Sequence, residues 1–172
     1  MTKAELIQKH AERLRHLQDE VHKFRKEGDT QRWEEASRAF FDAYERLAIP
    51  GGLTESLNRL KDLEATAIDD AVTFLEADPF FFRSGYIKEE ILGRLRAAPL
   101  DPGQKKRLQQ VILARVRDTT TKREFRRYCA LAPYVSDAFF EEEITTLAGS
   151  SGEKPNRAQW VLDRLRQGIP KR

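Results

Sequence analysis

The stretch from Thr2 to Leu47, TKAELIQKHAERLRHLQDEVHKFRKEGDTQRWEEASRAFFDAYERL, decides the fold. Its core-type positions alternate between intervals of three and four residues, which places them along one face of a helix. In the first half these positions are Ile7, His10, Leu14, Leu17, Val21 and Phe24, and in the second half they are Trp33, Ala36, Phe40, Ala43 and Leu47. Phe41 and Tyr44 widen the second stripe into a further contact face. Because Gly28 separates the halves, we predict two antiparallel helices, an αα-hairpin over residues 1–50.

The ends of both helices carry capping signals. Thr2 and Glu5 form a T-x-x-E capping box, in which each side chain satisfies a free backbone amide of the first turn. Asp29 or Thr30 is placed to cap the second helix. Beyond the hairpin, we expect residues 53–168 to form one continuous helical region.

The rest of the chain also has helix-ending residues at intervals typical of an all-α protein. Nine glycines and seven prolines fall mostly in short clusters that divide the chain into segments of helical length. Strand signals are nearly absent, so we predict eight or nine helices. Whether the apolar pattern from Leu53 to Leu75 forms one helix or two stays open.

Three helix pairs are expected after the hairpin, over residues 66–97, 103–132 and 136–167. Their first helices align as segments 72–78, 112–118 and 144–150, and each segment ends on a side chain that can cap the next helix. Residues 66–167 thereby resemble the HEAT-like class of helical repeat proteins, including bacterial ones. The resemblance implies antiparallel pairs stacked into a superhelix. A compact α-helical bundle is the alternative.

Composition excludes several classes of protein. The 172 residues are 34% charged with a net charge of +3, which fits a globular fold. The longest apolar run, Tyr128–Ala132, is far shorter than the roughly 20 residues that span a bilayer. Charged residues throughout the first turns leave no signal-peptide core, so we expect a cytoplasmic protein. The single Cys129 excludes disulfide frameworks and multi-cysteine metal sites.

No motif for catalysis, a cofactor or a metal occurs. The sequence lacks phosphate-binding glycine loops, H-E-x-x-H and a G-x-S-x-G elbow. Since His10, His16 and His22 point roughly 120° apart on one helix, they cannot bind a common metal. Cys129 shares a face with Phe125 and is expected to be a buried hydrophobe. We predict that the chain is not an enzyme and has no cofactor.

Charge is strongly segregated. Residues 28–82 carry five basic and twelve acidic side chains, whereas residues 83–127 carry thirteen basic and five acidic ones. On the helix expected from Thr121, the basic side chains cover one arc opposite an apolar face. We predict that this basic face binds a partner through Lys122, Arg123, Arg126 and Arg127. Alternatively, the acidic segment neutralises it within the fold. Arg115 falls inside an apolar arc and should face a carboxylate, Asp69 or Asp70.

The function favoured by these features is a helical scaffold or adaptor that binds another protein. Nucleic-acid binding through the basic face is the alternative, because arginines gain affinity from phosphates without a sequence motif. Asp78-Pro79 is expected to begin a helix, and the following Phe80, Phe81 and Phe82 cannot all face one core. At least one ring should pack between helix layers, which is the favoured outcome, or remain exposed at the surface, which would imply a partner. A monomer is favoured over a homodimer, because the second helix already covers the first.

Overall fold

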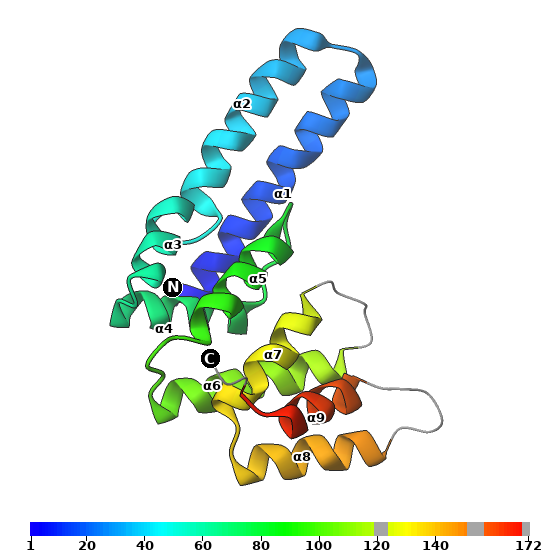
Figure 1. The fold of residues 1–172 in the computed structure, drawn as a ribbon. Helices are drawn as coiled ribbons and strands as arrows, with labels where there is room; N and C mark the ends of the chain where they lie inside the picture. Colours follow the sequence, from blue (N-terminus) through cyan, green and yellow to red (C-terminus); the bar gives the residue numbers. More distant parts are fainter. Residues whose placement is uncertain (119–123, 151–156, 170–172) are drawn as a thin grey trace. The chain divides into compact units, whose positions relative to one another are not determined.

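The computed structural model describes residues 1–118, 124–150 and 157–169, and in these residues it is all-α, with nine helices and no strand (Figure 1). The helices are α1 (Lys3–Glu27), α2 (Thr30–Leu47), α3 (Leu53–Lys61), α4 (Ala65–Ala77), α5 (Ser84–Leu95), α6 (Pro102–Arg117), α7 (Phe125–Val135), α8 (Ala138–Gly149) and α9 (Arg157–Gln167). The all-α prediction is therefore confirmed. None of these helices is long and apolar enough to cross a membrane.

Contacts within the chain gather into two compact units, Met1–Ile87 and Lys88–Arg172. The first unit contains α1 to α4 and the beginning of α5, and the second contains the rest of α5 with α6 to α9. The division predicted from the sequence, residues 1–50 and 53–168, stays a prediction.

The α1–α2 hairpin forms as its sequence indicates. Glu5 donates its backbone N–H to Thr2 Oγ1 over 3.2 Å, and Thr2 donates its N–H to Glu5 Oε2 over 2.6 Å, which completes the capping box. Gly28 ends α1 with φ of 74°, a left-handed conformation that favours glycine. Asp29 then caps α2 by accepting the N–H of Arg32. Helices α1 and α2 lie side by side along their length (Figure 1).

Burial along the hairpin is uneven. The fully buried residues of α1 are Ile7, Ala11, Leu14 and Leu17, all in the half that also packs against α4. Towards the turn, Val21 and Phe24 are half-buried and Trp33 is exposed, although all three continue the predicted stripe. Among the described residues of the first unit, Phe24 and Trp33 at the turn are therefore covered mainly by α1 and α2, whereas Phe82 lies beside Phe40 further from the turn.

The rest of the first unit packs at the base of the hairpin. Helix α4 buries six residues, and it is joined to α1 by an ion pair between Lys3 and Asp70 and by a hydrogen bond from Gln8 Nε2 to the Ala77 carbonyl. The pattern from Leu53 to Leu75 forms two helices, because Leu63 takes a left-handed φ of 58° between α3 and α4.

The expected helix start at Asp78-Pro79 is wrong. Asp78 is the C-cap of α4, with a left-handed φ of 45°, and α5 begins only at Ser84. The same dipeptide fits a helix end, since Asp tolerates the left-handed conformation and Pro cannot continue a helix. Phe80, Phe81 and Phe82 thus lie in the segment between α4 and α5.

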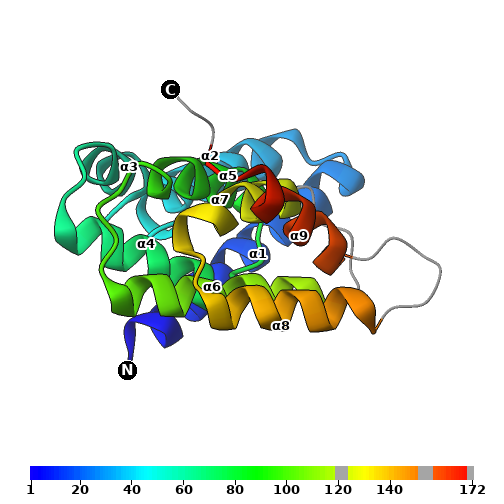
Figure 2. The same cartoon turned by 60° about the horizontal axis from the view of Figure 1, so that its bottom comes forward.

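In the second unit, a buried glutamine ties three helices together. Gln109 on α6 donates to the Val135 carbonyl at the end of α7 (2.7 Å) and to Oδ2 of Asp137 (2.8 Å), which caps α8. The hydrogen bond from Gln109, together with that from the Phe140 N–H, lowers the pKa of Asp137 below its usual value. Helices α6 and α8 run in the same direction in Figures 1 and 2, and Arg117 of α6 pairs with Glu143 of α8 at 2.6 Å.

A carboxylate close to Arg115 lies on its own stretch of chain. Arg115 is mostly buried, and its Nη1 lies 3.8 Å from Oδ2 of Asp118, three residues further along. Asp70, one of the two carboxylates expected beside Arg115, pairs with Lys3. The sequence showed that the guanidinium needed an anion, but not that a local one was available.

Candidate interaction surfaces

In the residues that the structure describes, helix α7 has an exposed basic side and a buried apolar side, as expected. Arg126 and Arg127 are exposed, whereas Phe125, Tyr128, Cys129 and Ala132 are buried. Lys122 and Arg123 lie outside the described residues. The structure therefore brings together two of the four predicted site residues, both at the beginning of α7.

An exposed aromatic ring lies next to the beginning of α7. Trp160 of α9 packs against Phe125 with 5.9 Å between ring centroids, and half of its surface stays exposed. The guanidinium of Arg157 also lies over the Phe125 ring, 4.7 Å from its centroid. Arg157 donates to the carbonyls of Arg115 and Asp118, so it fixes the start of α9 to the end of α6. The beginning of α7 thus carries exposed arginines, and the nearby Trp160 lies on α9, whose start is hydrogen-bonded to the end of α6.

Cys129 is a buried hydrophobe, as the sequence indicates. Burial raises the pKa of its thiol to about 12, which keeps it protonated at neutral pH. Since the thiolate is the nucleophilic form, this environment gives Cys129 no reactivity.

Possible metal ligands were not found grouped in the described part of the chain. Within residues 1–118, 124–150 and 157–169, no three His, Cys, Asp or Glu side chains are grouped to hold a metal ion. His10 is half-buried in the hairpin, and its Nδ1 has no hydrogen-bond partner among the described atoms.

The phenylalanine triplet is divided between core and surface. Phe81 is buried and packs against Tyr44, whose pKa is raised by burial although Arg83 opposes this shift. Phe80 and Phe82 are exposed, with 69% and 41% of their surfaces accessible. The sequence correctly indicated that the three rings cannot share one core. An exposed ring in this triplet is the feature from which the sequence predicted a partner.

Phe82 extends an aromatic cluster on the hairpin. Its ring meets Phe40 of α2 at 5.8 Å between centroids, and Phe40 also contacts the exposed Phe41 at 5.6 Å. Next to Phe82, the guanidinium of Arg83 lies 5.8 Å from the Phe82 centroid and 5.6 Å from that of Tyr86. Arg83 has a left-handed φ of 62°, a conformation that costs energy for a non-glycine residue.

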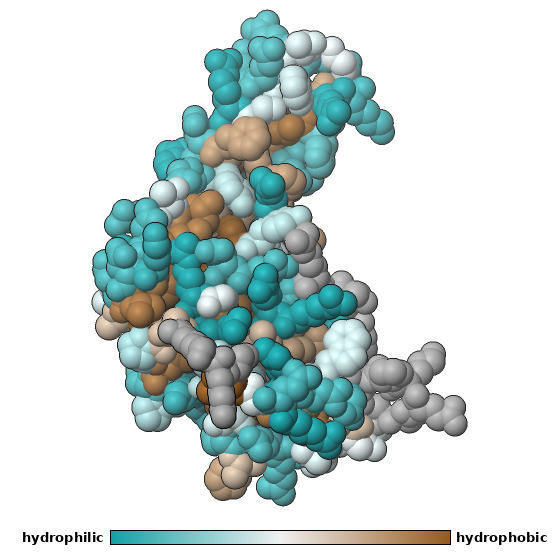
Figure 3. All heavy atoms as spheres, in the orientation of Figure 1, coloured by the Kyte–Doolittle hydropathy of each residue, from teal (hydrophilic) through white to brown (hydrophobic). Residues whose placement is uncertain are grey.

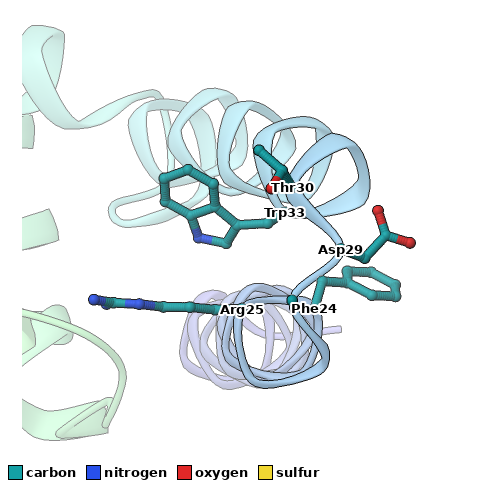
Figure 4. A pocket seen from close by; sticks show the side chains of 6 residues that line it. Phe24, Arg25, Asp29, Thr30 and Trp33 are labelled. Atoms are coloured by element: carbon teal, nitrogen blue, oxygen red, sulfur yellow. The ribbon is translucent and has the colours of Figure 1, made fainter.

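Two hollows lie on the hairpin. One, of about 300 Å³, is at the turn and is lined by Phe24, Arg25, Gly28, Asp29, Thr30 and Trp33 (Figure 4). The other, of about 130 Å³, is lined by Gln18, Val21, His22, Ser37, Phe40, Phe41 and Phe82. In the space-filling view, apolar side chains lie between the hydrophilic surfaces of α1 and α2 (Figure 3). The sequence suggested a second contact face at Phe41, but not that this face stays uncovered.

Comparison with protein-family models, curated proteins and solved structures gives no match to this chain.

Proposed function

We propose that this chain is a non-enzymatic helical scaffold or adaptor that binds another protein. Its partner-binding surface would include Lys122, Arg123, Arg126 and Arg127. The observation that carries the proposal is that Arg126 and Arg127 are exposed at the beginning of α7, where the half-exposed Trp160 packs against Phe125. Arginine and aromatic residues are enriched in protein interfaces, where they supply most of the binding energy.

The architecture proposed for the scaffold is a stack of HEAT-like pairs. In the second unit, α6 with α7 and α8 with α9 form successive helical hairpins. The first helices of the two pairs are linked by Gln109 with Asp137 and by Arg117 with Glu143, and the second helices, α7 and α9, pack directly. In a repeat stack, the first helices of successive pairs lie together, and so do the second helices. The arrangement of α6 to α9 therefore supports the proposal over an unrelated bundle.

Nucleic-acid binding through the same arginines is the competing function, and salt dependence separates the two. The experiment measures fluorescence anisotropy of labelled single-stranded RNA, single-stranded DNA and duplex DNA with the wild-type chain and with an Arg126→Glu, Arg127→Glu variant. We expect no binding at about 50 mM salt, where phosphate contacts are strong. Binding with a steep salt dependence that the variant loses would overturn the proposal in favour of nucleic acid.

Affinity capture with quantitative mass spectrometry tests the protein partner itself. A Lys105→Glu, Lys106→Glu variant is the matched control, because it makes the same charge change at exposed positions of α6. We expect at least one protein to be captured by the wild type and by this control, and to be lost with the α7 variant. Equal capture by all three proteins would show that Arg126 and Arg127 are not part of the surface.

A further inference from the structure

The two hollows on the hairpin belong to one side of it. Gln18, His22 and Arg25 are spaced by four and three residues on α1, and Trp33, Ser37 and Phe41 are spaced by four on α2. Residues at these spacings lie above one another on a helix face. Figure 4 shows the side chains of Trp33 and Arg25 extending to the same side, while Phe24 points to the other. The two hollows therefore lie in line along the same side of the α1–α2 seam, and together they are called the groove below.

This groove has an apolar floor and one closed end. Its apolar members are Val21, Phe40, Phe41 and Phe82 in the second hollow and Trp33 at the turn. Phe82, from the segment between α4 and α5, bounds it towards the base of the hairpin. At about 1.5 Å per residue, the rows from Gln18 to Arg25 and from Trp33 to Phe41 extend roughly 10 to 12 Å, the length of two turns of helix.

The α1 edge of the groove is basic. Arg15, His22, Arg25 and Lys26 fall within an arc of about 100° that contains Gln18, with Asp19 at its outer margin. The four basic side chains and Asp19 are exposed, and Arg15, Arg25, Lys26 and Asp19 form no ion pair with a described residue. On the α2 edge, Ser37 and Phe41 line the groove and Glu34 lies beyond them. The unpaired charge beside the groove is thus mainly positive and on one side.

We propose that this groove binds an amphipathic α-helix of a partner protein, with acidic residues along the flank that faces α1. An apolar seam between two helices accepts the apolar face of a third, as in other helix-in-groove complexes. Trp33 and Phe41 would anchor the apolar face, and Arg25 would pair with a carboxylate on the flank. Because this surface shares no residue with α7, it is independent of the binding surface proposed above.

Selection from a displayed peptide library tests the proposal. The library consists of helical peptides of about 15 residues, long enough to form helix on binding. Leu, Ile, Phe, Met or Trp occupies the apolar positions, and Glu, Gln or Lys occupies the two flanks. On the wild-type chain we expect enrichment of Glu on a single flank. On an Arg25→Glu variant, the enriched residue on that flank should change to Lys.

Selected peptides are then measured individually by fluorescence anisotropy. We expect Phe41→Ala to weaken binding at least about tenfold, whereas Arg126→Glu, Arg127→Glu leaves it unchanged. Phe41 is 64% exposed, so this variant folds, and its circular dichroism and urea midpoint verify that. The proposal is overturned if no peptide prefers the wild type to Phe41→Ala, or if the two flanks show no charge preference.

A second copy of the chain is the other occupant that could cover the groove. Sedimentation velocity of the wild type and of Phe41→Ala at increasing concentration distinguishes it. We expect both proteins to sediment as monomers. A wild-type dimer that Phe41→Ala dissociates would contradict the proposal and assign the groove to self-association.

Discussion

The hairpin and the second unit use similar sequence patterns but bury them to different extents. In the second unit, α7 places its whole apolar side in the core, where Phe125, Tyr128 and Ala132 meet α6 and α9. In the hairpin, the α1 stripe is buried where α4 packs against it, Phe40 of α2 is buried beside Phe82, and the stripe is open near the turn. A helix pair alone cannot cover a wide apolar stripe. The difference therefore separates apolar residues that are buried in the fold from apolar residues that stay accessible at the surface.

The largest effect is expected in the core of the second unit. Phe140 of α8 is buried and its neighbour Phe139 is 78% exposed. Phe140→Ala should lower the free energy of unfolding by about 3 to 5 kcal/mol, because it removes a ring from a close-packed site. Phe139→Ala should change it by less than about 0.5 kcal/mol. Urea unfolding followed by circular dichroism measures both, and similar costs for the two would contradict a closed core in this unit.

An intermediate effect is expected along α1, where burial falls towards the turn. Leu14→Ala should cost about 2 to 5 kcal/mol, because Leu14 is fully buried. Val21→Ala should cost only about 1 kcal/mol, because Val21 is half-buried and loses fewer contacts. The same urea titration measures both variants. Equal costs, after allowance for side-chain size, would mean that the distal hairpin is as well covered as its base.

The smallest effect concerns the turn itself. Gly28→Ala should destabilise the chain by about 1 kcal/mol, because alanine is strained at the left-handed φ of 74° although nothing obstructs its Cβ. Gly93→Ala is the matched control: its Cβ also meets open space, and its helical backbone suits alanine. This control should stabilise by about 0.5 to 1 kcal/mol. Thermal unfolding measures both variants. If both substitutions stabilise the chain, or both destabilise it, the left-handed conformation of Gly28 is not the cause of the change at the turn.

Much of the helical layout could be predicted because local signals specify it. The capping box at Thr2 and Glu5, Gly28 at the turn and Asp29 after it act within a few residues, and the structure shows each in its predicted place. Asp78-Pro79 was misread because the dipeptide fits both the start and the end of a helix. In the structure Asp78 ends α4 and Phe81 packs against Tyr44, a contact that the dipeptide itself does not specify.

The candidate surfaces were less predictable because exposure depends on distant parts of the chain. The periodic stripe of α2 contains Trp33 and Phe40 alike, yet Phe40 is buried by Phe82 and its neighbours while Trp33 is not. On α7, amphipathicity alone gave the exposed side, so Arg126 and Arg127 could be predicted. Trp160 could not be placed beside Phe125 from sequence, since the two lie 35 positions apart along the chain.

The central claim is that the open stripe of the hairpin serves binding and not folding, and the adjacent rings of Phe40 and Phe41 test it most directly. Phe40 is buried and Phe41 is exposed on the same helix. Urea unfolding and binding of the selected acidic helix are measured together on Phe40→Ala and Phe41→Ala. Phe40→Ala should lose about 3 kcal/mol or more of stability. Phe41→Ala should keep its stability within about 0.5 kcal/mol and lose binding at least tenfold. A Phe41→Ala protein that is strongly destabilised, or that binds as well as the wild type, would contradict the account.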